Sequence, residues 1–117
     1  MTVKLKRFLE NLIDGYSDEA PENADYPYKV FSARKLSDDD GIAHYILEVN
    51  VWDKGKTYSR AETLMDELEK KLNKQTFLVK ELFAYTYTGS RENVSDPDRA
   101  IKRVREQFEL RVVEREE

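Results

Sequence analysis

The stretch that decides the fold runs from Tyr26 to Asp53, and its two ends read Tyr26-Pro27-Tyr28-Lys29-Val30-Phe31 and Tyr45-Ile46-Leu47-Glu48-Val49-Asn50-Val51-Trp52-Asp53. Strand-forming residues at 28–35 and the alternation of apolar with polar residues at 42–52 predict two β-strands. The acidic turn at 37–41, Ser-Asp-Asp-Asp-Gly, joins them. One face of the second strand is apolar. The other carries Ile46 and Trp52 among polar residues, and this is a face that another element or another subunit can cover.

Two amphipathic helices are predicted, one on each side of this hairpin. Apolar residues at helical spacing run from Leu5 to Ile13, with Thr2 as the N-cap and Asp14-Gly15 as the stop. A second helix is predicted at 59–72, where Ser59 and Glu62 match a capping box. The polar segment 17–25 after the first helix predicts a surface loop.

The C-terminal part predicts two further strands. Residues 77–88 alternate as in a strand, and residues 89–98 predict a loop. The apolar spacing at 100–115 suits a helix or a strand, and its β-rich end at 108–113 favours a strand. The predicted order is helix, strand, strand, helix, strand, strand. It indicates a single α+β domain, residues 1–117, with an antiparallel sheet and two helices packed on one face. The exposed sheet face or an edge strand is then available for oligomerisation.

Composition limits the classes of function. The chain has 117 residues, no cysteine and a formal net charge of −4. Without cysteine it has no disulfides, zinc–thiolate sites or thiol nucleophiles. No apolar run approaches the ~18 residues that predict a membrane-spanning helix, and the N-terminus lacks the apolar run of a signal peptide. The negative net charge does not favour binding to nucleic acid, because proteins that bind nucleic acid usually carry a net basic surface.

Candidate chemical sites are few. His44, the single histidine, is predicted to be a half-buried structural residue of the second strand, since no nucleophile motif accompanies it. Three adjacent aspartates at 38–40 lack the spacing of a calcium loop and fit a hairpin turn. Asp96 and Asp98 flank a proline and fit a turn better than a metal pair. No glycine pattern for nucleotide binding occurs. We therefore expect no enzymatic activity, no cofactor and no metal.

The segment 99–105 is the one basic cluster, formed by Arg99, Lys102, Arg103 and Arg105. Together with Tyr85 and Tyr87 on a neighbouring strand, it could bind single-stranded nucleic acid by stacking. Glutamates follow closely, so ion pairs between strands or between subunits are the favoured role.

The order and spacing of several short motifs resemble the tail-completion (tail-terminator, head–tail joining) proteins of long-tailed bacteriophages and prophages. The resemblance spans nearly the whole chain. Its elements are the amphipathic N-terminal helix, Tyr26-Pro27-Tyr28, the strand Tyr45 to Trp52-Asp53, the helix at 59–72, Asp96-Pro97-Asp98, Arg103, and Phe108-Glu109-Leu110.

This resemblance implies a non-enzymatic virion-assembly protein. Members of the family form an oligomeric ring, often a hexamer, that caps the head-proximal end of the tail tube and joins it to the head connector. The expected partners are other copies of the chain, the tail tube protein and the connector, first in the cytoplasm of the bacterial host and then in the virion. The expected interface residues are Trp52, Asp53, Arg91, Arg103 and Arg105. A different neck protein or adaptor, and a small nucleic-acid-binding module, are the alternatives.

Overall fold

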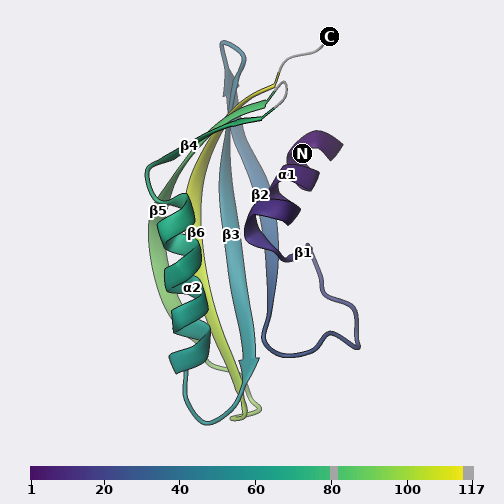
Figure 1. The fold of residues 1–117 in the computed structure, drawn as a ribbon, viewed down its shortest axis with the longest axis vertical. Coiled ribbons are helices and arrows are strands. Elements are labelled where there is room, and N and C mark those ends of the chain that lie inside the picture. The colour runs from purple at the N-terminus through teal and green to yellow at the C-terminus, as the bar shows by residue number, and fades with distance from the viewer. Residues whose placement is uncertain (80–81, 115–117) are drawn as a thin grey trace.

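A computed structural model of the chain describes residues 1–79 and 82–114. Its helices and strands are α1 (Val3–Ile13), β1 (Tyr16–Ser17), β2 (Tyr28–Asp39), β3 (Ile42–Lys54), α2 (Ser59–Leu72), β4 (Gln75–Val79), β5 (Leu82–Val94) and β6 (Ile101–Glu114). The strands form one six-stranded sheet in the order β1-β2-β3-β6-β5-β4 (Figure 1). All neighbours are antiparallel except β1 and β2, which are parallel.

The predicted α+β fold with a four-stranded antiparallel sheet is wrong. The described chain is mostly β-structure, and two short strands extend its sheet. The sheet is mixed because one of them, β1, pairs in parallel with β2. The first, β1, lies at the start of the predicted surface loop, and its residues pair in parallel with Val30 and Phe31. The second, β4, begins at Gln75 and overlaps the start of the stretch 77–88, for which the sequence predicts a single strand. Lys80 and Glu81 of that stretch lie outside the described residues.

The sheet has an inner face, which packs against both helices, and an outer face. Buried apolar residues of both helices and of the inner face form one core cluster: Leu5, Leu9, Ile13, Phe31, Tyr45, Leu47, Val49, Val51, Ala61, Met65, Leu68, Leu72, Leu82, Ala84, Val104, Phe108, Leu110 and Val112. On β3 these core residues alternate with His44, Ile46, Glu48, Asn50 and Trp52, which point to the outer face.

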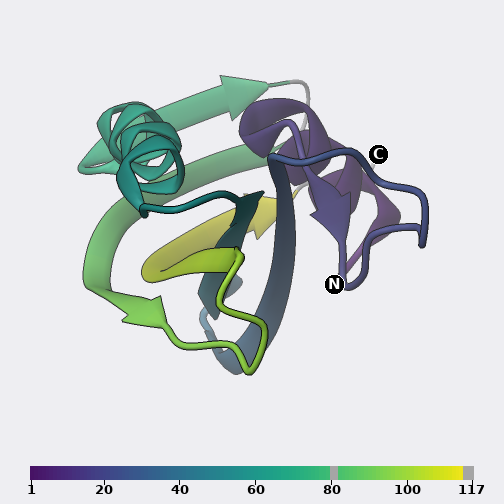
Figure 2. The same ribbon diagram turned by 90° about the horizontal axis from the view of Figure 1, so that it is seen from below.

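The sheet is strongly curled. Figure 2 shows β5 bending round so that β4 lies on the same side of the molecule as the two helices. The rings of Phe8 in α1 and Phe77 in β4 meet edge to face, with 5.5 Å between their centroids. The curl therefore brings one edge of the sheet against α1, and the outer face of β2, β3 and β6 stays without a helix over it.

A β-bulge in β5 changes which side chains face inward. The pairing of β5 with β6 shifts between Thr88 and Arg91, and Gly89 lies so close to β6 that a Cβ there would be 3.0 Å from the Gln107 carbonyl oxygen. Before the bulge the even-numbered residues face the core; after it, Arg91 and Asn93 do, and they contact α2. The predicted loop at 89–98 is therefore wrong as far as Val94.

Other local predictions have mixed outcomes. The Thr2 cap is confirmed, since its hydroxyl accepts a hydrogen bond from the Leu5 amide at 3.2 Å. The capping box at Ser59 is wrong: Tyr58 is the N-cap, without a side-chain hydrogen bond. The strand prediction for 100–115 is confirmed from Ile101 to Glu114, which form β6; Ala100 precedes the strand, and Arg115 lies outside the described residues.

Gly15 gives a test of the β1–β2 pairing. A Cβ at Gly15 would lie 2.9 Å from the Lys29 backbone oxygen, whereas one at Gly55 would have nothing within 4 Å. We expect Gly15→Ala to lower the free energy of unfolding by about 1–3 kcal/mol, because β1 must move away from β2. Gly55→Ala is the matched control and should change it by less than about 0.5 kcal/mol. Urea unfolding measures both; equal effects would contradict the close approach.

Candidate functional site

The outer face carries an aromatic and arginine platform, which we define as Tyr28, Trp52 and Arg103. These residues lie side by side on β2, β3 and β6, because Trp52 is in register with both Tyr28 and Arg103. The Tyr28 and Trp52 rings are nearly parallel, with centroids 6.4 Å apart. The Arg103 guanidinium carbon lies 4.7 Å from the Trp52 ring centre. At this distance the cation is attracted by the ring face.

Hydrogen bonding and burial fix the platform further. Arg103 Nε donates a hydrogen bond of 2.8 Å to Oδ1 of the buried Asn50. Tyr26 and Tyr16 extend the aromatic surface, with centroids 5.3 Å and 6.3 Å from that of Tyr28. Burial raises the pKa of the Tyr28 hydroxyl. The platform is therefore a preformed surface.

Arg105 lies at the middle of the outer face and is neutralised locally. Its guanidinium forms ion pairs with Glu92 of β5 and, at 3.4 Å, with Glu48 of β3. Arg103 and Arg105 are thus on the same face, two residues apart on β6, but only Arg103 is left without a carboxylate partner among the described residues.

Asp53 lies on the opposite face from Trp52, because successive strand residues point to opposite sides of a sheet. Its buried carboxylate accepts hydrogen bonds from the Lys54 amide, at 2.7 Å, and from the Arg60 side chain of α2, at 2.9 Å to Nε. The Arg60 guanidinium lowers the pKa of Asp53. The structure therefore separates the predicted pair: Asp53 anchors the start of α2, and Trp52 faces outward.

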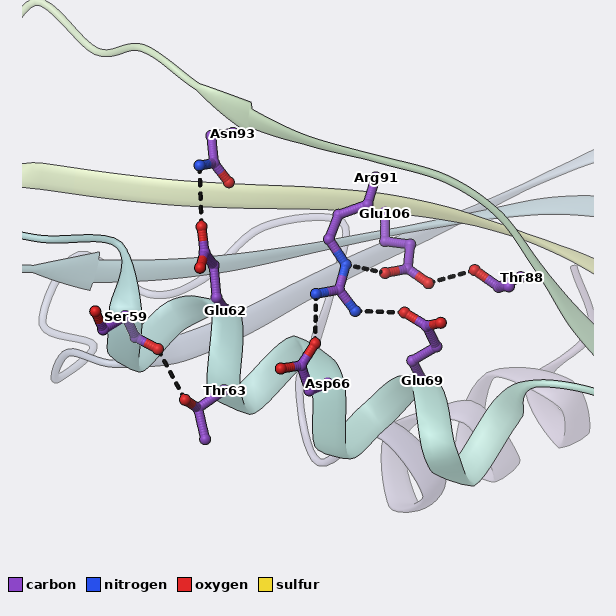
Figure 3. Close-up of polar contacts among 9 residues, drawn as sticks. All are labelled: Ser59, Glu62, Thr63, Asp66, Glu69, Thr88, Arg91, Asn93 and Glu106. Carbon is purple, nitrogen blue, oxygen red and sulfur yellow. Dashed lines mark hydrogen bonds and ion pairs between the residues drawn. The ribbon is translucent and has the colours of Figure 1, made fainter.

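Arg91 also lies on the inner face, under α2 (Figure 3). Its guanidinium forms ion pairs with Glu106 of β6 and with Asp66 and Glu69 of α2. Glu106 is 1% exposed and also accepts a hydrogen bond from the Thr88 hydroxyl. Arg91 therefore forms ion pairs with three carboxylates and links β6 to α2.

The predicted nucleic-acid arrangement is not assembled in the structure. In the register of the sheet Tyr85 is opposite Arg111, and Tyr87 is opposite Glu109, so both lie away from Arg103 and Arg105. Lys102 faces the other side of the sheet, with its ammonium 5.2 Å from the Tyr58 ring centre. The cation near the tyrosines is Arg111, 5.8 Å from the Tyr87 ring centre.

The structure adds a shallow apolar groove that sequence reasoning missed. It lies at the other end of the outer face and is lined by Ile42, Phe83, Tyr85, Arg111 and Val113. The outward position of Phe83 and Tyr85 could be read from their alternation, but their closeness to Ile42 depends on a strand order that the sequence does not state.

Comparison with models of protein families gives no match for this chain, and comparison with curated proteins gives none either. Within residues 1–79 and 82–114, no helix has the length and apolar character needed to cross a membrane. The same residues hold no group of three or more histidine, aspartate or glutamate side chains placed to bind a metal.

Asp53 predicts a pH-dependent stability. Because its pKa is lowered in the folded state, its contribution is present above the ordinary aspartate pKa and is lost as the pH falls through the lowered value. We expect Asp53→Asn to lower the free energy of unfolding by about 1–2 kcal/mol at neutral pH. The difference from the unsubstituted protein should shrink in acid. Urea unfolding over a range of pH measures it, with the exposed Asp38→Asn as control. A difference that stays constant with pH would contradict the assignment.

Arg91 predicts a second stability effect. Replacing Arg91 by methionine leaves the buried Glu106 without its cation. We therefore expect the free energy of unfolding to fall by about 3 kcal/mol at neutral pH. Burial raises the pKa of Glu106, so its contribution to stability is greatest below the ordinary glutamate pKa and is lost as pH rises through the raised value. Adding Glu106→Gln to Arg91→Met should therefore recover part of the loss.

The matched control for Arg91 is Arg105→Met, which removes ion pairs to the more exposed Glu48 and Glu92. We expect Arg105→Met to lower the free energy of unfolding by at most about 1 kcal/mol. Thermal or urea unfolding of the unsubstituted protein, Arg91→Met, the double variant and Arg105→Met measures these differences. If the double variant is no more stable than Arg91→Met, the buried charge of Glu106 is not the cause.

Proposed function

We propose that this protein is a non-enzymatic assembly subunit that binds other protein chains through the outer face of its sheet. The observation that carries the proposal is the preformed platform on a sheet face that no described helix covers. Tryptophan, tyrosine and arginine are the residues that most often supply binding energy in protein interfaces. Their positions are already fixed by stacking and by the Asn50 hydrogen bond, so binding would cost little side-chain entropy.

The particular role we propose is that of a phage tail-completion protein. It would cap the head-proximal end of the tail tube as a ring of identical subunits and join the tube to the head connector. The support for this role is the ordered resemblance along the chain, which includes Trp52 and Arg103. The protein would act in the cytoplasm of the bacterial host during assembly and then remain in the virion.

Each interface residue expected from the sequence has a distinct place in this proposal. Trp52 and Arg103 would contact a partner directly. Arg105, with Glu48 and Glu92, would set the charge pattern that selects the partner, since charge pairs contribute more to specificity than to affinity. Asp53 and Arg91 would act indirectly, because both position α2.

An adaptor that binds one partner without forming a ring would use the same platform, and the number of copies in assembled particles distinguishes the two roles. A nucleic-acid-binding role has less support. Arg105 is already paired with two carboxylates, and Lys102 faces the other side of the sheet. Salt-dependent binding of single-stranded DNA or RNA would favour that role.

Deletion of the gene from the phage that encodes it tests the proposal. We expect electron microscopy to show full heads beside unjoined or overlong tails, because the tube then lacks its terminating ring. The unsubstituted gene should restore joined virions, and so should Glu67→Ala, an exposed change on α2. The double variant Trp52→Ala, Arg103→Ala should not restore them, provided that its thermal unfolding shows a folded protein. Joined virions with tails of normal length in the deletion would refute the proposal.

A further inference from the structure

The groove belongs to an apolar row that crosses four strands on the outer face. Phe83 of β5 is in register with Val113 of β6 and with Leu78 of β4. Ile42 of β3 lies next to this row, because the following residue, Ala43, pairs with Val112. Leu78 is 81% exposed, and Phe83 and Ile42 are exposed as well. Contiguous apolar residues on a solvent-facing surface mark an interaction site.

The groove also has a cation without a partner carboxylate. Its cavity volume is about 430 Å³, and its walls are the apolar or aromatic residues Ile42, Phe83, Tyr85 and Val113, with Arg111 as the one basic residue. Arg111 lies 5.8 Å from the Tyr87 ring centre and forms no ion pair with any residue in the described part of the chain. An occupant should therefore combine an apolar side chain with a carboxylate.

The chain itself carries such a segment at the tip of the β2–β3 hairpin, which projects at one end of the long axis (Figure 1). Leu36 is 55% exposed, and three aspartates follow it after Ser37. Asp38 is paired with Lys35 at 2.9 Å, whereas Asp39 and Asp40 form no ion pair with a described residue. The tip thus offers one apolar side chain and two uncompensated carboxylates.

We infer that the groove binds the hairpin tip of a second copy of the chain, with Leu36 against the apolar walls and the Asp39 carboxylate paired with Arg111. Within one copy, Asp39 is in register with Ile42 at the edge of the groove, yet it forms no ion pair with Arg111 among the described residues. The charges and the apolar surfaces of tip and groove are complementary. This inference rests on the proposed function in that it names the contact through which ring subunits would meet.

Two arrangements of the subunits are compatible with this contact. Tip and groove lie at the same end of the molecule, so two copies can exchange tips reciprocally about a two-fold axis. Each tip can instead enter the next groove in a head-to-tail ring. Both arrangements bury the row, and both require Asp39 and Arg111 to be close together.

Sedimentation of the purified full chain, at concentrations up to about 1 mM, tests the inference. We expect a concentration-dependent dimer or ring. Arg111→Asp and Asp39→Arg should each weaken self-association about tenfold or more, because like charges then face each other. Phe83→Asp should weaken it as well. The matched control is Arg7→Asp on the exposed face of α1, which should leave it unchanged.

Mixing the two single variants gives the sharpest result. Arg111→Asp provides an acidic groove, and Asp39→Arg provides a basic tip, so the mixture should associate more tightly than either variant does alone. Thermal unfolding checks that every variant is folded. A monomer at all concentrations, or an Arg111→Asp variant that associates as well as Arg7→Asp, would overturn the inference. Normal virions from the gene deletion would remove the tail role alone and leave the measured self-association standing.

Discussion

The buried ion pair between Arg91 and Glu106 is the interaction on which the arrangement of helix and sheet depends. Arg91 reaches the inner face only because the bulge after Thr88 shifts the alternation of β5. From there its guanidinium meets Asp66 and Glu69 on α2 as well as Glu106 on β6. A buried carboxylate without this cation would be costly, so the bulge, the arginine and the position of α2 depend on one another.

The same arrangement separates the two faces of the sheet: the inner face holds the core and both helices, and the outer face is the one we propose for binding. Both helices pack on the inner face, where Asp53 fixes the start of α2 through Arg60 and Arg91 fixes its middle. The outer face is left with side chains that contact mainly one another. Trp52 and Asp53 show the division most clearly, since adjacent residues of one strand serve opposite faces.

The local periodicity of the sequence was enough to predict both helices and the β2–β3 hairpin. It left residues 100–115 ambiguous between helix and strand, and the β-rich end at 108–113 decided for the strand that is β6. The sheet order could not be predicted, because it depends on pairings between distant segments. Residues 89–98 contain glycine, serine, asparagine and proline and are typical of a loop, yet the first six continue β5, where Asn93 and Arg91 contact α2. The two-residue strand β1 is too short for any periodic signal. Among the candidate site residues, Trp52 and Arg103 are expected from the resemblance, but their contact arises from the β3–β6 register. The apolar groove was missed for the same reason.

The platform and the groove lie far apart on one face, and this separation bears on function. Trp52 lies ten positions after Ile42 on β3, which corresponds to about 33 Å along an extended strand. The molecule itself is 48 Å long, so the two surfaces lie towards its opposite ends. A partner bound at one end would leave the other accessible. A subunit that must hold its own neighbours and also contact a tube or a connector needs two such independent surfaces. In the role that we propose, the preformed stack of Trp52 and Arg103 would contact a partner of a different kind, and the groove would bind the hairpin tip of another copy.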